Sequence, residues 1–205
     1  MTERRTPVAL LLAAGRGTRF DPGGGALKLL APAPVGPHVG QPLALAAALN
    51  LRAALPVVVA VVRPADLPQQ RTLHALLRDA GCRLAINESA DRGIGSSIAT
   101  GVRATPDAAG WLIALADMPA VATSTIGAVA QALADGAATA APVHAGRRGH
   151  PVGFGAGLRN ELQALTGDEG ARHILAAHPP RIIDVDDSGC LLDLDHAGDF
   201  ERARR

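Results

Sequence analysis

Short apolar runs recur along this chain and alternate with longer stretches in which apolar residues, mostly Ala and Leu, stand three or four positions apart. The runs have the length of strands, and the spacing between them is typical of amphipathic helices. This alternation indicates βαβ units, which build a mostly parallel sheet covered by helices. The predicted strands are 7–13, 56–62, 82–86, 111–116, 138–142 and 181–185, with a short one near 190–194.

Helices are expected between these strands, and the 205 residues are expected to form one α/β domain, 1–205. In an open α/β sheet, ligands bind outside the carboxyl ends of the strands, so residues that directly follow a strand are candidates for a site. The predicted helices are 42–54, 66–79, 96–104, 123–134, 157–165, 168–177 and 197–204, and the one long irregular segment, rich in Pro and Gly, is 21–42.

Composition argues against nucleic acid and membranes as partners. Lys and Arg number 20 against 19 Asp and Glu, so the chain carries no strong basic field. Three Phe, one Trp and no Tyr leave few side chains on which bases could stack. The longest apolar run, 53–62, is far shorter than the roughly 20 residues of a membrane span. The N-terminal sequence has no signal-peptide pattern, and we expect a cytoplasmic protein.

Several other chemistries lack their motifs. Cys82 and Cys190 are isolated and are expected to be buried thiols rather than a disulfide or a metal pair. The sequence contains no G-x-S-x-G elbow, no H-E-x-x-H and no Cys/His cluster. An acyl hydrolase or a zinc enzyme is therefore not supported.

The turn after the first strand has the composition of a phosphate site. Gly15 and Gly17 let the backbone turn sharply and expose its N–H groups, while Arg16, Arg19 and the later Lys28 supply positive charge for a polyphosphate. The segment is neither a Walker A loop nor a complete dinucleotide fingerprint. An ordinary βα turn with solvated arginines remains the alternative.

A polar segment follows the third predicted strand and opens a helix. It begins at Asn87 and ends in Gly95, Ser96 and Ser97, whose N–H and hydroxyl groups could contact a ribose or a base. The alternative is that Ser96 or Ser97 is only the N-cap of the helix.

Acidic residues follow two further predicted strands. Asp117 comes directly after the fourth, and Asp195 comes after the last. Mg²⁺ that accompanies a nucleotide needs only one or two protein carboxylates, so the pair suits a metal site. Asp117 could instead cap the following turn.

Two later segments carry further polar candidates. Arg147 and Arg148 offer guanidinium groups for a phosphate and His150 offers an imidazole, although a basic surface turn explains them equally well. Asp168 stands where an N-cap or a first-turn acid of the next helix is expected.

Taken in order, these motifs resemble the molybdopterin nucleotidyltransferases of molybdenum cofactor maturation, and most closely the molybdenum cofactor cytidylyltransferases. The resemblance extends over nearly the whole chain. It implies a three-layer α/β/α fold with a mostly parallel, Rossmann-like sheet of the nucleotide-diphosphosugar transferase type. The motifs are LLLAAGRGTRF, Lys28, GIGSSIATGV, LADMP, GRRGHPVGF, GDEGAR and DLDHAGDF.

The resemblance also implies a reaction, in which CMP passes from CTP to the terminal phosphate of molybdopterin and pyrophosphate leaves. Lys28, Arg19 and Asp117 would be the catalytic residues, and Mg²⁺ or Mn²⁺ would be held by Asp117 and Asp195. A molybdenum hydroxylase would receive the product. The nucleotide would contact Ala13, Ala14, Gly15, Arg16, Gly17, Lys28, Asn87, Gly95, Ser96 and Ser97, and the pterin substrate would contact Arg147, Arg148, His150, Asp168 and Arg172.

The chain departs from the family at two points. The spacer between Arg19 and Lys28 carries the additional residues DPGGG, and DHAGDF replaces the usual DTPEDL around Asp195. Two other functions remain open. One is nucleotidyl transfer with GTP or to another small phosphorylated acceptor, and the other is a non-catalytic carrier of the finished pterin cofactor. Lys28 and Asp117 argue against a carrier, because it needs no triphosphate site.

Overall fold

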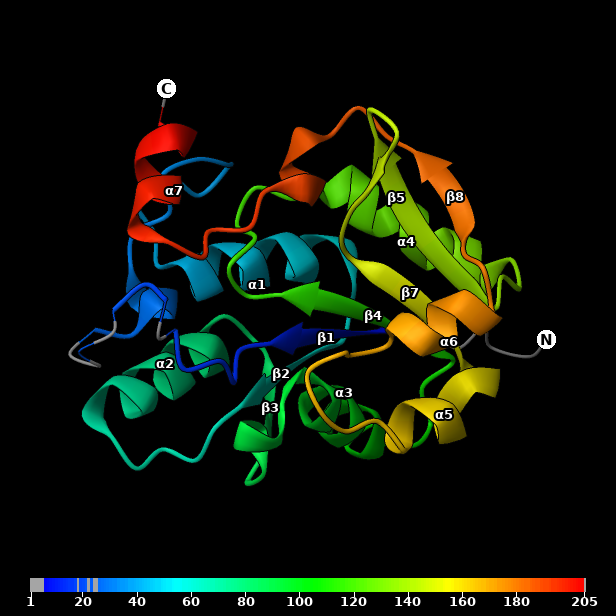
Figure 1. The fold of residues 1–205 in the computed structure, drawn as a ribbon, viewed down its shortest axis with the longest axis horizontal. Coiled ribbons are helices and arrows are strands. Elements are labelled where there is room, and N and C mark those ends of the chain that lie inside the picture. Colours follow the sequence, from blue (N-terminus) through cyan, green and yellow to red (C-terminus); the bar gives the residue numbers. More distant parts are fainter. Residues whose placement is uncertain (1–5, 18, 22, 24–25, 205) are drawn as a thin grey trace.

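An eight-stranded mixed sheet runs through the centre of the computed structural model, which describes residues 6–17, 19–21, 23 and 26–204 (Figure 1). Thr18 of the first turn and Pro22, Gly24 and Gly25 of the next loop lie outside the described residues. The strand order is β3-β2-β1-β4-β7-β5-β6, and β8 also pairs with β5. The strands are β1 Val8–Leu12, β2 Val58–Val62, β3 Arg83–Ile86, β4 Gly110–Leu115, β5 Thr139–His144, β6 Arg147–Arg148, β7 Val152–Gly155 and β8 Arg181–Asp184.

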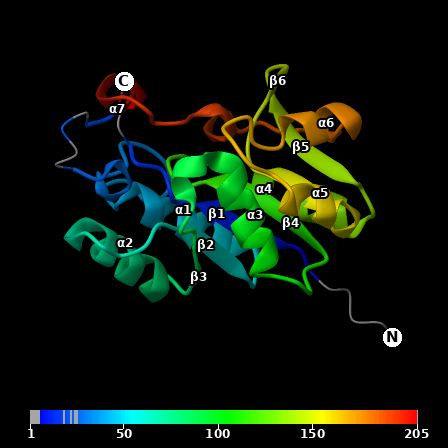
Figure 2. The ribbon, with the colours of Figure 1, turned by 60° about the horizontal axis from the view of Figure 1, so that its bottom comes forward.

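Helices cover both faces of the sheet, which gives the three layers expected from the sequence (Figure 2). One face packs against α1, α2 and α4, and the other against α3, α5 and α6. The last helix, α7, packs beside the segment between β1 and α1, where the rings of Phe20 and Phe200 lie 5.3 Å apart. The helices are α1 Leu43–Ala54, α2 Pro68–Asp79, α3 Ile94–Arg103, α4 Thr123–Ala134, α5 Arg159–Gln163, α6 Arg172–Ala177 and α7 Ala197–Ala203.

The alternation of side chains along β1 explains its place at the centre of the sheet. Ala9 and Leu11 belong to the core on one face, and Leu10 belongs to the core on the other. The strand is buried throughout and pairs in parallel with β2 and with β4. Since β3 is parallel to β2, the carboxyl ends of β1 to β4 share one edge of the sheet, as the βαβ pattern predicts.

Strand β7 was not predicted from the sequence. It lies antiparallel between β4 and β5, and its four residues, VGFG, are too short and too rich in glycine to indicate a strand. Gly153 is required by packing here, since a Cβ would lie 2.9 Å from Cγ1 of Val129. The close packing of α4 therefore requires glycine at position 153, although glycine is more typical of loops than of strands.

Two local predictions and one alternative were wrong. The segment expected as a strand near 190–194 begins with a 3₁₀ turn, Ser188–Leu191, where the Asp187 carboxylate accepts from the N–H of Gly189. The helix expected at 168 begins at Arg172, because Gly167 and Gly170 have positive φ, so Asp168 is not its cap. Neither Ser96 nor Ser97 caps α3, whose N-cap is Gly93.

Two further expectations can be compared with the structure. Cys82 and Cys190 are both free and buried, as predicted. Within the part of the chain that the structure describes, no helix has the length and the apolar character needed to cross a bilayer.

Two glycines in helices provide a matched test of this packing. A Cβ on Gly101 in α3 would lie 2.8 Å from a Leu10 methyl carbon, whereas a Cβ on Gly127 in α4 meets nothing within 4 Å. We expect Gly101→Ala to lower the free energy of unfolding by about 1–3 kcal/mol through overpacking. Gly127→Ala should raise it by roughly 0.5–1 kcal/mol. Urea unfolding followed by the fluorescence of buried Trp111 measures both, and equal stability of the Gly101 variant would contradict this packing.

Candidate functional site

A cavity of about 440 Å³ lies at the carboxyl edge of the sheet, where the ends of β1 and β4 meet the C-terminal segment. We call it the central cavity. Half of the predicted site residues line it, although they come from distant parts of the chain. Those residues are Gly15, Arg16, Gly17, Arg19, Lys28, Ser97, Asp117, Asp168 and Asp195.

A lysine between two carboxylates lies in the wall of this cavity. Nζ of Lys28 is 2.6 Å from Oδ2 of Asp117 and 2.7 Å from Oδ1 of Asp195. The Lys28 side chain is only 7% exposed, and the two carboxylates compensate the free-energy cost of burying its charge. Asp117 therefore does not cap the next turn but is paired across the cavity.

The ion pairs also fix the charge states of this cluster. Burial alone would lower the pKa of Lys28, but the attraction of Asp117 and Asp195 outweighs burial and raises the pKa. Burial likewise acts to raise the pKa of Asp195, but hydrogen bonding to Lys28 and the charge of Arg19 lower it. At neutral pH Lys28 is thus a cation and Asp195 an anion.

Local backbone geometry brings Lys28 to the glycine turn despite the longer spacer. Gly17 has a φ of +67°, and a Cβ on it would lie 3.0 Å from Cβ of Lys28. Lys28 itself begins a 3₁₀ turn, Lys28–Leu30, whose first two residues are buried. A side chain at position 17 would be strained and would press on the lysine, which explains the second glycine of the motif.

The C-terminal segment holds Asp195 in place. Oδ2 of Asp199 accepts from the backbone N–H groups of Asp195 and His196, at 2.9 and 2.6 Å, so Asp199 stabilises the start of α7. Nη1 of Arg19 lies 2.7 Å from the second oxygen of Asp195. The replaced motif DHAGDF therefore still places a carboxylate beside Lys28.

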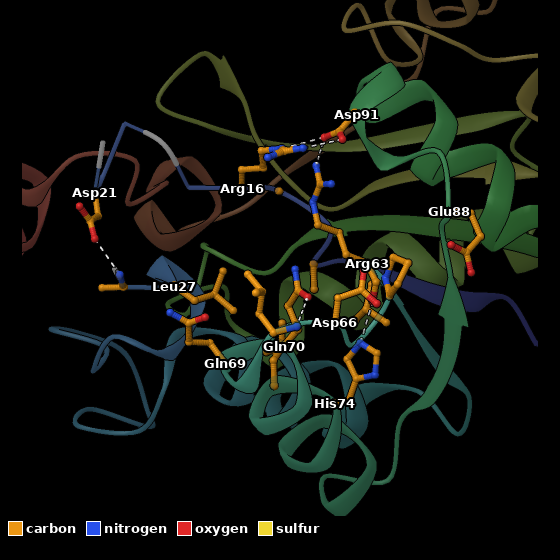
Figure 3. Close-up of a pocket in the computed structure, with 17 residues that line it drawn as sticks. Arg16, Asp21, Leu27, Arg63, Asp66, Gln69, Gln70, His74, Glu88 and Asp91 are labelled. Atoms are coloured by element: carbon orange, nitrogen blue, oxygen red, sulfur yellow. Dashed lines mark hydrogen bonds and ion pairs between the residues drawn. The ribbon is translucent and has the colours of Figure 1, made fainter. Parts of the chain in front are cut away.

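A second ion-pair cluster lies in the wall of the central cavity and consists of Arg16, Arg63 and Asp91 (Figure 3). Arg16 donates to both oxygens of Asp91, at 2.8 and 2.6 Å, and Arg63 donates to one of them at 2.7 Å. Hydrogen bonding to Arg16 and then to Arg63 holds the pKa of Asp91 below its usual range, and Asp91 raises the pKa of Arg16. Arg63 also donates through Nε to the carbonyl of Ala14, at 2.6 Å.

This cluster borders another cavity, of about 450 Å³, which we call the side cavity. Helix α2 forms one wall of it with Gln69, Gln70 and His74 (Figure 3). Ala13, predicted to bind nucleotide, lines the side cavity rather than the central one. The two cavities share Gly15, Arg16, Arg63 and Asp91.

The polar residues at the start of α3 mostly bond to one another. Asn87 donates to the hydroxyls of Ser96 and Ser97, at 2.9 and 3.0 Å. Ser96 in turn lies 2.8 Å from the carbonyl of Gly93, and the N–H of Gly95 donates to the carbonyl of Gly167. Of these four predicted nucleotide ligands, only Ser97 lines the central cavity.

Four predicted pterin-binding residues do not line the central cavity. Arg147 and Arg148 form the exposed strand β6, and Arg172 begins α6. His150 borders a narrow cavity of about 10 Å³ beside Asn50 and Met118, and its Nδ1 atom is buried without a partner among the described residues. Asp168 alone of this group lies in the central cavity.

The acid pair fits a hard divalent cation. The two carboxylate oxygens already converge on one positive charge, that of Lys28. Among the described residues no group of three or more His, Cys, Asp and Glu side chains could hold a metal. Two carboxylates suffice for Mg²⁺ or Mn²⁺ when phosphate oxygens and water complete the coordination.

Three charged cavity residues were missed at the sequence level: Arg63, Asp91 and Asp193. Arg63 directly follows β2, so the strand-end argument that selects Asp117 applies to it as well. Asp91 lies within the segment that opens α3, but nothing in the sequence indicates that two arginines meet there. Asp193 has only its proximity to Asp195 as a signal.

Comparison with known proteins supplies the family. The family model of MobA-like NTP transferase domains matches residues 9–182. The chain belongs to this family. No curated protein matches this MobA-like domain.

Solved structures have the same fold. Rv0371c from Mycobacterium tuberculosis H37Rv is 25% identical with a TM-score of 0.79, and the match covers 97% of this chain and 98% of that one. The same protein in complex with manganese matches at 24% identity and a TM-score of 0.74, over 97% of both chains. Mth528, a nucleotidyl transferase from Methanothermobacter thermautotroptrophicus, is 22% identical with a TM-score of 0.77, over 97% and 96% of the two chains. The fold is thus that of NTP transferases.

The buried imidazole of His150 predicts a pH dependence of stability. Burial lowers the pKa of His150 below its unfolded value, so the unfolded chain binds the proton more readily. Its contribution to stability is complete above the unfolded pKa, near 6.5, and decreases as the pH falls. Between pH 7.5 and 5.5 we expect the native protein to lose about 1 kcal/mol more unfolding free energy than His150→Gln. Urea unfolding at both pH values measures this.

The control for this measurement is His173→Gln, which replaces an exposed histidine. It should lose as much stability as the native protein over the same pH interval. An identical loss in the His150 variant would show that this imidazole is protonated equally well in the folded and unfolded chains.

Proposed function

We propose that this chain transfers CMP from CTP to the terminal phosphate of molybdopterin and releases pyrophosphate. The family supports nucleotidyl transfer as the general activity. The choice of CTP and of molybdopterin rests on the ordered motifs, including Ala14 before Gly15, which resembles the cytidine branch. A molybdenum hydroxylase as the recipient follows from the same resemblance.

The observation that carries the proposal is the buried Lys28 between two carboxylates, directly below the glycine turn. A site of this kind combines positive charge for a polyphosphate with oxygen ligands for a divalent cation. Lys28 and Arg19 are the side chains that we assign to the β- and γ-phosphates of the nucleotide. The backbone N–H groups around Gly15 and Gly17 would donate to the same phosphates. A protein that only carried a finished cofactor would need none of these groups.

The reaction needs no protein nucleophile. An ionised oxygen of the acceptor phosphate attacks the α-phosphorus of CTP, a new P–O bond forms, and the bond from the α-phosphorus to the bridging oxygen breaks. The electron pair leaves with pyrophosphate, so the main task of the protein is to align the reactants and to neutralise charge. Lys28 suits the second task, because its raised pKa keeps it protonated.

Asp117 and Asp195 are the residues that we propose for the metal. A bound Mg²⁺ or Mn²⁺ would neutralise phosphate charge and orient the triphosphate. The manganese complex of Rv0371c supports a divalent cation in a protein of this fold. In this chain the two acids reach the same point from β4 and from the C-terminal segment, and Arg19 fixes the second oxygen of Asp195.

The remaining residues divide into a nucleoside side and an acceptor side. For the nucleoside we propose Ala13, Ala14 and the hydroxyl of Ser97, with Asn87, Gly95 and Ser96 behind it. The hydrogen bond from Asn87 fixes the position of the Ser97 oxygen. For the acceptor we propose Asp168, which lines the central cavity. Arg147, Arg148, His150 and Arg172 are assigned to the acceptor from the resemblance alone.

The decisive experiment measures pyrophosphate release from purified protein with Mg²⁺ and molybdenum-loaded molybdopterin, with CTP, GTP, ATP and UTP in parallel. We expect release with CTP. Release with GTP alone would replace the donor and keep the reaction class. Binding of the pterin without release from any nucleotide would favour a carrier.

Removal of the β4 carboxylate should slow the reaction much more than it affects folding. We expect Asp117→Asn to reduce the rate of pyrophosphate release by about 10²-fold or more, because the variant loses a proposed metal ligand. The matched control is Asp107→Asn, an exposed acid in the turn before β4. A normal rate in the Asp117 variant would exclude a catalytic role for this residue.

Lys28 should compete with a metal for the acid pair when no nucleotide is present. We therefore expect Lys28→Met to bind Mn²⁺ roughly tenfold more tightly than the native protein, a difference of about 1.4 kcal/mol. The electron paramagnetic resonance signal of free Mn²⁺ measures this without any catalysis. Arg16→Met removes a charge from the same cavity without touching the pair and should change the affinity much less. Equal affinity in all three proteins would place the metal elsewhere.

A further inference from the structure

Asp91 binds two arginines at the point where the two cavities meet. Both cavities are lined by Arg16, Arg63 and Asp91. Figure 3 shows the two guanidinium groups converging on the carboxylate from different segments, Arg16 from the turn after β1 and Arg63 from the end of β2. Asp91 itself lies in the loop between β3 and α3. The cluster thus connects three neighbouring strand ends.

Fold stability does not account for the pairing of Arg16 with Asp91. The side chains of Arg16 and Asp91 are 63% and 59% exposed, and an exposed ion pair contributes little to stability. What the pairing does is restrict two long side chains. Arg16 is held by a two-point contact, which sets both the position and the plane of its guanidinium group.

The loop that carries Asp91 has a firm attachment. The N–H of Gly167 donates to the carbonyl of Arg92 at 2.8 Å, and the N–H of Gly95 donates to the carbonyl of Gly167 at 2.9 Å. The two loops pack so closely at Gly93 that a Cβ there would lie 2.4 Å from the carbonyl oxygen of Gly167. Asp91 is therefore a fixed point to which the arginines can be oriented.

Arg63 is fixed from two further directions. Its Nε donates to the carbonyl of Ala14, immediately before the glycine turn, and its own carbonyl accepts from Nε2 of His74 at 2.8 Å. Its side chain is only 17% exposed. In both arginines Nε and Nη2 are occupied, while Nη1 has no partner within the described residues. Each arginine can therefore still donate to an anion.

We propose that Asp91 is a positioning residue that holds the guanidinium groups of Arg16 and Arg63 ready for the phosphates of the donor nucleotide. This assignment rests on the proposed function. Ordering two flexible side chains in advance removes an entropy cost that binding would otherwise bear. Asp91 itself does not touch the ligand, and its negative charge opposes the anion that the arginines bind.

Because the charge of Asp91 opposes a bound anion, the direction in which the anion affinity changes in a variant tests the proposal. If Asp91 acted only through its charge or as a competitor for the arginines, then Asp91→Asn would strengthen the binding of an anion. Positioning predicts the reverse, because the amide keeps only one acceptor oxygen and the two-point contact of Arg16 needs both. Titration calorimetry with tripolyphosphate and with CTP, both with Mg²⁺, should show about tenfold weaker binding by Asp91→Asn. Equal or tighter binding would overturn the proposal.

Three further variants complete the experiment. Asp66→Asn makes the same change of charge on the side cavity, where its carboxylate meets no described partner, and it should bind within about twofold of the native protein. Asp91→Glu should recover part of the lost affinity. In an Arg16→Met background, Asp91→Asn should have a clearly smaller effect, because one of the two side chains that it positions is gone. A full effect in that background would contradict positioning through Arg16.

Kinetics provide a readout that a purely structural role would not produce. In the pyrophosphate assay, Asp91→Asn should raise the KM for the nucleotide about tenfold and change kcat by much less. If Asp91→Asn fails to fold, Asp91→Glu decides the same question: it keeps the charge but moves the carboxylate, so positioning predicts weaker binding than in the native protein, and equal binding would overturn the proposal. If the native protein binds neither CTP nor tripolyphosphate, the proposed function fails together with this inference. If the native protein binds both and Asp91→Asn binds equally well, only the positioning role fails.

Discussion

The charge of Lys28 is the constraint on which the site depends. A lysine that is almost fully buried needs compensation, and here it comes from two carboxylates that lie far apart in the sequence. The requirement ties the loop after β1, the end of β4 and the segment before α7 to one point. Two acids against one ammonium leave a net negative charge, which Arg19 offsets only from the outer, exposed side. The charges of the cluster compensate one another well enough for Lys28 to be buried, and the two carboxylates still attract a further cation.

The parallel strands of the sheet bring the other residues of the cavity to the same edge as Lys28. Because β1 to β4 are parallel, each contributes its carboxyl end to the same edge, and each end carries a different function. The turn after β1 provides Gly15 and Gly17, and Arg63 follows β2. The loop after β3 provides Asp91, the helix after that loop provides Ser97, and Asp117 comes after β4. These strand ends are coupled to one another, because Asp91 binds Arg16 and Arg63, and Lys28 binds Asp117. A substitution at one strand end therefore also changes the surroundings of side chains at its neighbours.

The sequence predicted much of this arrangement because its signals are local. Strand-length apolar runs place β1 to β5 and β8 closely, and residues just after strands include Gly15 and Asp117. The signals that failed are those set by tertiary contacts. The glycines of β7 have the composition of a loop, but the close approach of α4 requires a glycine at position 153. The pairing of Asp91 with two arginines, 75 and 28 residues away in the sequence, depends on which loops the fold brings together. No spacing rule contains that information.

The origin of Asp195 has a consequence for how the site can vary. Lys28 and Asp195 are 167 residues apart, and the matched family region ends at residue 182, before this acid and before α7. Asp195 lies outside the strands of the sheet, in the segment that packs Leu194 and Phe200 into their own small core. Lys28 keeps Asp117 as a partner from the sheet itself. A change in the C-terminal segment can thus alter the charge around Lys28 while the sheet and its own carboxylate stay as they are.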